Sequence, residues 1–247
     1  MAGDSKRRRR DWKTWEADAD ATGYEEFDPL NRVNLGRSLE TALLSKPLTP
    51  LTSVPPFWGS GIYAIYFRGS DAEALYGRLA ASPSPIYVGR AVPAGARKGL
   101  VEEEEGRRSK TLWIRLDEHL DSIGQAQDLN AGDFRCRWLV ADMLFVPMAE
   151  RLMIQTYRPL WNLLIDGFGN HDPGSGRYDQ ERSRWDTLHP GRYWAPNLAE
   201  PPYTATDLRA QIRAHLDEHP PELAPVLPPI IRAPVIEPQP EDNDGLF

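Results

Sequence analysis

The sequence predicts a mixed α/β (α+β) fold in which a small sheet is flanked by helices. Short segments rich in Ile, Val, Tyr and Phe alternate with segments of helical periodicity through the central part of the chain. Hydrophobic residues make up 40% of the 247 residues, which is enough for one substantial core. Residues 61–67 are expected to be a strand, because they are rich in Ile, Tyr and Phe and are bounded by Gly and Ser, and residues 85–92 have the same character. Residues 134–141 are expected to be a third strand.

Helices are expected where apolar residues recur at helical spacing. Residues 34–44 form the first, and a short helix at 71–81 joins the first two strands. In residues 112–123 the apolar side chains mark one face of a helix, while Arg115 and His119 stand together on another face.

Three further segments complete the expected order of elements. A helix at 148–157 follows Pro147 and stops at Pro159, since proline is tolerated in a first helical turn and ends a helix later. A terminal helix covers 204–219. Residues 101–108 are expected to be an exposed loop, because four glutamates beside two arginines are costly to bury.

The chain is expected to have four parts: an arm and helix at 1–56, a principal domain at 57–200, the terminal helix at 201–219 and a tail at 220–247. Prolines and acidic residues predict that this tail is disordered. Within the principal domain, residues 167–196 are irregular and rich in Gly, Pro, Arg and Trp. We interpret them as an ordered functional insertion rather than a linker, and refer to them below as the insertion.

Composition excludes several classes of protein. No apolar run is long enough to span a bilayer, and the first residues lack the apolar stretch of a signal peptide, so a cytoplasmic location is expected. The single cysteine, Cys136, excludes an internal disulfide and a cysteine-based zinc site. Its alternating neighbours indicate a buried strand position.

The net charge of −7 looks unfavourable for a protein that binds nucleic acid, but the charge is unevenly distributed. Residues 217–247 contain seven acidic residues against Arg232 alone, so the first 216 residues carry only −1. Local basic patches, rather than total charge, determine contact with phosphates. Basic residues cluster at 6–10, 90–98, 107–110 and 177–184.

Two aromatic triplets lie on the first two expected strands, Gly61-Ile62-Tyr63 and Tyr87-Val88-Gly89. Downstream of them come, in order, Arg115, His119, Glu150 and Asn162. A tripeptide alone is weak evidence, so the interpretation depends on the ordered set. This set resembles that of the GIY-YIG nuclease superfamily, and no member of it is missing.

Two flanking segments sharpen the resemblance. Residues 88–93 and 166–174 are similar to those of the Type II restriction endonucleases of this superfamily that cut the palindrome CCGCGG. The similarity covers roughly residues 57–194. It implies a three-stranded antiparallel core and Mg²⁺-dependent hydrolysis of a phosphodiester in double-stranded DNA. It also implies a homodimer on the palindrome and a cognate DNA methyltransferase in the same cell.

The resemblance assigns a role to each residue of the set. Glu150 matches the single metal-binding glutamate, and a hard carboxylate oxygen suits Mg²⁺. Arg115 would neutralise charge that develops on the phosphate. Tyr87 would orient the phosphate or the water, and Asn162 would brace the site by hydrogen bonding. The base that activates the water is left open between Tyr63 and His119.

Contacts to DNA are expected from basic side chains in three stretches of the chain: Arg90, Arg97, Lys98, Lys110, Arg177, Arg182 and Arg184. Arginines are the residues that read guanine bidentately, which would suit a GC-rich site. His171 with Asp172, and His189, form a second candidate group, although their spacing matches no metal motif.

Two other functions are compatible with the sequence. One is a repair or mobile-element nuclease of the same superfamily, although the segment after Tyr203 is too short and too rich in proline for a separate DNA-binding domain. The other is a noncatalytic DNA-binding module with the same fold. The complete catalytic set argues against the second.

Overall fold

The computed structural model of the protein describes residues 32–70, 74–94 and 103–221. Most of the expected amino-terminal arm, Arg97, Lys98 and nearly all of the expected tail lie outside these residues. In the described parts, no helix is both long and apolar enough to cross a membrane.

The centre of the fold is a four-stranded antiparallel sheet with the order β1-β4-β2-β3. Its strands are β1 (Thr49–Pro50), β2 (Gly61–Phe67), β3 (Tyr87–Ala91) and β4 (Phe134–Val140). The three expected strands are confirmed, and β1 is an addition to them. This short strand pairs with Cys136 and Arg135 at the edge of the sheet, where a proline is tolerated because no ladder hydrogen bond needs its missing N–H.

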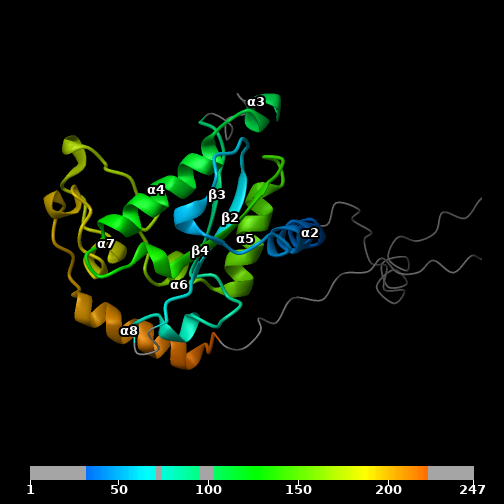
Figure 1. Ribbon diagram of the computed structural model, residues 1–247. Helices are drawn as coiled ribbons and strands as arrows, with labels where there is room; N and C mark the ends of the chain where they lie inside the picture. Colours follow the sequence, from blue (N-terminus) through cyan, green and yellow to red (C-terminus); the bar gives the residue numbers. More distant parts are fainter. Residues whose placement is uncertain (1–31, 71–73, 95–102, 222–247) are drawn as a thin grey trace, which may run out of the picture. The chain divides into compact units, whose positions relative to one another are not determined.

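Helices cover both faces of the sheet (Figure 1). Every residue of β2 is buried, so this central strand has no solvated side. Ile62, Ala64 and Tyr66 face one apolar cluster, which α2 (Arg32–Leu44) and α5 (Val146–Tyr157) complete.

The alternate residues of β2, Tyr63, Ile65 and Phe67, face a larger apolar cluster on the other side of the sheet. This second cluster contains side chains from four helices: α4 (Thr111–Gln125), α6 (Leu160–Leu163), α7 (Arg184–Leu188) and α8 (Ala205–Glu218). The candidate catalytic tyrosine therefore belongs to the face that the insertion and α8 close.

Two expected elements are wrong in detail. Within 71–81, the described residues form turns and a 3-10 helix at Gly77–Leu79 rather than an α-helix. The segment expected to be a loop contains the short helix α3 (Glu103–Arg107). Glu104 is exposed, as expected, but a helix lets it pair with Arg108 at 2.9 Å, one turn apart.

The insertion is ordered, as expected, and aromatic side chains dock it onto the sheet. Trp161 of α6 contacts the rings of Phe168, Trp185 and His189 with centroid separations of 4.5–5.9 Å. His189 is 1% exposed, and its Nε2 lies 2.7 Å from the hydroxyl of Tyr76. His189 is thus a core residue, which rules out the metal-binding role considered for it beside His171.

Burial lowers the pKa of His189 below its ordinary value, although Asp128, 2.9 Å from Nδ1, opposes this shift. The ring is therefore neutral: Nδ1–H donates to Asp128, and Nε2 accepts the proton of the Tyr76 hydroxyl. Unfolding exposes His189 and restores its ordinary pKa, about 6.5.

We expect the stability of the protein to fall as the pH drops below about 6.5, because only the unfolded state then takes up this proton. The slope is at most about 1.4 kcal/mol per pH unit for each such histidine. Thermal melts of His189→Gln between pH 8 and pH 5 should show a flatter pH dependence than the parent. His171→Gln, at an exposed histidine, is the matched control, and an unchanged slope in His189→Gln would contradict this account.

Candidate active site

The pairing of β2 with β3 brings the two triplets together. Tyr63 pairs with Gly89, and Ile65 pairs with Tyr87, so both tyrosines project from the same face of the sheet. Their ring centroids are 6.2 Å apart. Gly89 leaves room for this arrangement, because a Cβ at that position would collide with the hydroxyl of Tyr63.

Helix α4 adds His119 to the tyrosines. The Nε2 atom of His119 lies 2.6 Å from the Tyr63 hydroxyl, and its ring stacks on Phe168 with centroids 4.3 Å apart. His119 is 1% exposed, so it is buried although it lies one helical turn from Arg115. The insertion supplies Phe168 as a cover, and the helical pattern of α4 alone contains no sign of that contact.

Burial sets the protonation states of this pair. Desolvation raises the pKa of Tyr63 well above its ordinary value; the neighbouring Tyr87 adds to the rise and Arg115 opposes it. Desolvation also lowers the pKa of His119 well below its ordinary value, and the charge of Arg115 acts in the same direction. Tyr63 is therefore protonated and donates its hydrogen bond to the neutral His119.

Arg115 is held by acceptors on two sides. Its Nη1 donates to Oε2 of Glu118 at 2.9 Å and to Nε2 of His171 at 2.7 Å. Its Nη2 donates to the carbonyl of Gly169 at 2.6 Å. Burial raises the pKa of both Tyr63 and Tyr87, and the charge of this guanidinium, which is 19% exposed, opposes that rise.

Asn162 braces the strand that carries Tyr87. Its Nδ2 donates to the carbonyl of Val88, and its Oδ1 accepts from the Val88 N–H, both at 2.8 Å. Since β3 is an edge strand, these backbone groups have no neighbouring strand to pair with. The side-chain amide satisfies both, which agrees with the bracing expected of Asn162; its effect on cleavage stays a prediction.

Glu150 reaches the same edge from the opposite face of the sheet. It lies in α5, and its Oε2 is 3.0 Å from Nε of Arg90 on β3. Burial raises the pKa of Tyr87 and the charge of Glu150 adds to this rise, so the carboxylate acts on the tyrosine across the strand. Among the described residues, no group of three or more His, Cys, Asp or Glu is arranged to hold a metal.

An open cavity of about 510 Å³ lies beside Arg115, with Arg90, Pro93, Ile114 and His171 in its lining. Arg115 and Arg90 both line it. Two of the six predicted catalytic and metal-binding residues have charges that bear on this cavity: Arg115 directly, and Glu150 through Arg90.

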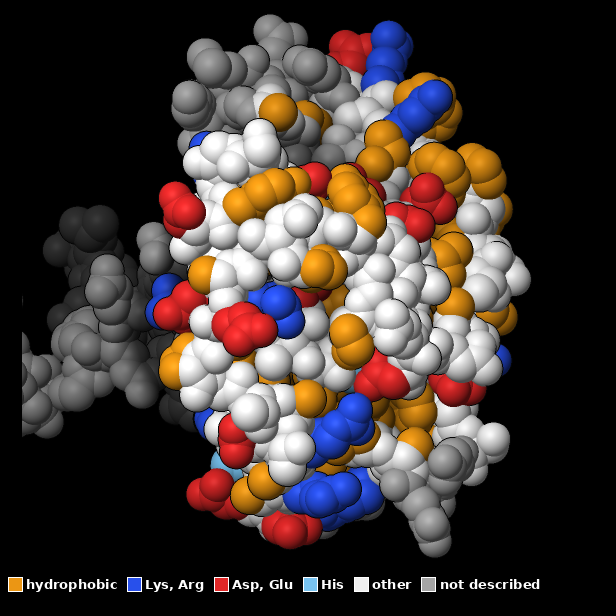
Figure 2. Space-filling model, turned by 90° about the vertical axis from the view of Figure 1, so that its left-hand side faces the viewer, with side chains coloured by type: hydrophobic (Ala, Val, Ile, Leu, Met, Phe, Trp, Pro, Cys, Tyr) orange, Lys and Arg blue, Asp and Glu red, His pale blue; other side chains and the backbone are white. Residues whose placement is uncertain are grey.

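The basic residues expected to contact DNA differ in their exposure and in their hydrogen bonds to the protein. Arg177 and Lys110 are exposed, and Lys110 lies over the ring of Trp58. By contrast, Arg182 donates to the carbonyl of Ala195, and Arg184 donates to that of Leu164. On the face seen in Figure 2, basic side chains gather near the upper and lower ends and are interspersed with acidic ones. Their contacts with DNA remain predictions.

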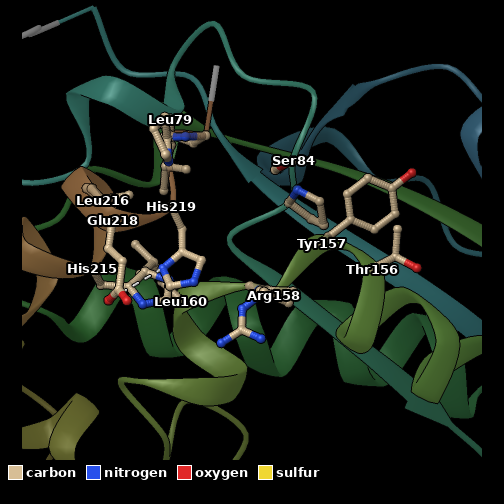
Figure 3. A pocket seen from close by; sticks show the side chains of 14 residues that line it. Leu79, Ser84, Thr156, Tyr157, Arg158, Leu160, His215, Leu216, Glu218 and His219 are labelled. Carbon is tan, nitrogen blue, oxygen red and sulfur yellow. Dashed lines mark ion pairs between the residues drawn. The ribbon is translucent and has the colours of Figure 1, made fainter. Parts of the chain in front are cut away.

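A second pocket, of about 290 Å³, lies between the end of α8 and the junction of α5 and α6 (Figure 3). His215 and His219 stack there with ring centroids 4.7 Å apart, and Arg158 lines the same pocket. None of the six residues of the candidate catalytic set lines it.

Sequence reasoning missed the contributions of Phe168, Gly169 and His171 to the site. His171 was grouped with His189, but the structure puts His171 beside Arg115 and His189 in the core. The contact between Arg115 and His171 joins residues 56 positions apart, and no spacing motif encodes it.

The comparison with known families agrees with this geometry. The family model of the Eco29kI GIY-YIG domain matches residues 55–216, which is more than half of the chain and includes all six residues of the set. No curated protein matches the chain at a significant level. The chain therefore belongs to the Eco29kI GIY-YIG family, a restriction endonuclease family of the GIY-YIG nucleases.

Proposed function

We propose that the protein is a Type II restriction endonuclease that makes Mg²⁺-dependent double-strand cuts in DNA at a GC-rich palindrome such as CCGCGG. The observation that carries the proposal is the family match across residues 55–216. The resemblance of residues 88–93 and 166–174 to endonucleases that cut CCGCGG supports the specificity. A proposed cytoplasmic location follows from this role, because the DNA that a restriction enzyme cuts is inside the cell.

The buried pair of Tyr63 and His119 suggests how water is activated. Neither group is a ready base in the free protein, because Tyr63 is protonated and both side chains are 1% exposed. In our proposal the oxygen of Tyr63 accepts a proton from the attacking water while its own proton moves to Nε2 of His119. The oxygen of water bonds to phosphorus, and the bond to the 3′ oxygen breaks.

Arg115 and Tyr87 act on the phosphate itself. The guanidinium fork of Arg115 neutralises charge that develops on the nonbridging oxygens. Tyr87 is half-buried at the edge strand, where its hydroxyl orients the phosphate or the water. Asn162 keeps β3, and therefore Tyr87, in place through the backbone of Val88.

The residues present fit a magnesium ion held by one protein carboxylate. Glu150 offers a hard oxygen ligand whose side chain is 23% exposed, and Mg²⁺ retains several waters and binds substrate phosphate rather than a full protein cage. When bound, the ion supplies charge stabilisation at the phosphate and the departing oxygen. Arg90 counterbalances the charge of Glu150 and orients its carboxylate.

Recognition of the bases falls to the insertion in this proposal. Arg177 is exposed and available, whereas Arg182 and Arg184 read bases only if they leave their backbone acceptors. A cell that contains such an enzyme needs a cognate methyltransferase to protect its own sites. A repair or mobile-element nuclease, or a noncatalytic binding module, remains the alternative.

Incubation of the purified protein with plasmid and Mg²⁺ distinguishes these functions. We expect discrete fragments, and sequencing of their ends should give one palindrome. Smears would indicate a nuclease without defined sites, and gel shifts without cleavage would indicate the binding module.

Replacing Glu150 tests the metal site. We expect Glu150→Gln to lower the cleavage rate at least about a hundredfold, because the proposed metal ligand is lost. DNA binding without metal should persist or tighten, since Arg90 loses its anionic partner. Glu200→Gln, at an exposed glutamate, is the control. Near-normal cleavage by Glu150→Gln would refute the assignment of Glu150.

A mixing experiment tests the proposed dimer. One set of catalytic residues per chain implies that a palindrome cut on both strands engages two chains. Mixing the active protein with an excess of Glu150→Gln should produce heterodimers that cut one strand, so nicked plasmid should accumulate. If only linear product forms, in proportion to the active fraction, each chain acts alone.

A further inference from the structure

The insertion touches the candidate active site through a short stretch, residues 168–171. Phe168 stacks on His119, the carbonyl of Gly169 accepts from Arg115, and His171 contacts the same guanidinium. Three residues of one stretch therefore contact His119 and Arg115 of α4.

The inner end of this stretch is anchored in the core. Arg192 is 2% exposed; it donates to the carbonyls of Gly167 and Phe168, and it is 3.3 Å from Asp186. Its guanidinium lies over the ring of Trp185 at 4.2 Å from the centroid. Because these groups are buried and mutually bonded, the position of the stretch is fixed by packing.

The outer end of the stretch connects to the surface of the insertion. Asp172 accepts from the N–H of Gly174 at 2.8 Å and from the hydroxyl of Tyr193 at 3.1 Å. The side chain of Tyr193 is 71% exposed. His171 therefore lies between a rigid interior and a surface that faces solvent.

His171 itself is held by polar contact rather than by burial. Its side chain is 63% exposed, and its Nε2 is 2.7 Å from Nη1 of Arg115. A guanidinium only donates, so His171 is the acceptor in this bond. Glu118 accepts from the same Nη1, and Gly169 accepts from Nη2. Together these acceptors on both terminal nitrogens set the plane and direction of the fork.

We propose that His171 is a positioning residue that aims the guanidinium of Arg115 at the scissile phosphate, so that the insertion controls cleavage as well as recognition. The inference rests on the proposed function, in which Arg115 acts on the phosphate. His171 contributes little to DNA affinity, because its role is exercised through Arg115.

The first test separates rate from affinity. His171→Leu removes the acceptor, and we expect its single-turnover rate at saturating DNA to fall about tenfold or more. Affinity for the same DNA without metal should stay within about twofold of the parent. His171→Gln keeps an acceptor oxygen and should recover most of the rate. His219→Leu, at a histidine that directly follows α8 and lines the second pocket, is the control and should cleave normally.

A double-mutant cycle tests the route through Arg115. In an Arg115→Ala background, His171→Leu should change the rate by less than about twofold, because its target is gone. The same loss in both backgrounds, or a fall in affinity parallel to the fall in rate, would overturn the proposal. Parent protein that cleaves no DNA would refute the proposed function, whereas normal cleavage by His171→Leu would refute only the role of His171.

Discussion

The register between β2 and β3 is the constraint on which the candidate site depends. It places Tyr63 opposite Gly89 and Tyr87 opposite Ile65, so that the two phenols share one face and converge on His119. A slip of one residue would turn one tyrosine to the face that α2 and α5 cover. The missing side chain of Gly89 is part of the same constraint, because it gives the Tyr63 hydroxyl its place above β3.

The edge position of β3 explains how groups from both faces of the sheet serve one site. A central strand would separate Glu150 from the tyrosines, but β3 is an edge strand, and both α5 and α4 contact it. This rim of the sheet would ordinarily expose unpaired backbone groups. Helix α6 satisfies several of them: Asn162 bonds both groups of Val88, and the N–H of Trp161 donates to Ile86.

Local pattern was sufficient to predict the elements but not their tertiary contacts. The strands and the helices α4, α5 and α8 could be predicted because alternation and helical spacing are short-range signals. The 3-10 turn at Gly77–Leu79 and helix α3 could not, since few residues decide between turn, helix and loop there. The motif order predicts the catalytic set, and the family match confirms the superfamily.

What the pattern could not predict is the environment of each catalytic side chain. The burial of His119 depends on Phe168, and the orientation of Arg115 depends on Gly169 and His171. All three partners come from the insertion, whose irregular backbone carries no periodic signal. The ion pair of Arg90 with Glu150 is equally nonlocal. It shows that Arg90, which the sequence suggests only as a DNA contact, also holds the carboxylate of Glu150.

The charges of the site are paired within the protein, and this pairing limits how the site can work. Arg115 has Glu118, and Arg90 has Glu150, each at about 3 Å. A phosphate that contacts either arginine therefore competes with a carboxylate, and the loss of that ion pair reduces the net free energy of phosphate binding. For Arg90 the exchange has a direction: a cation that takes Glu150 as a ligand weakens the hold of that carboxylate on Arg90. In the proposed reaction, metal binding on one face of β3 would thus release a positive charge for DNA at the rim, and the two events would favour each other.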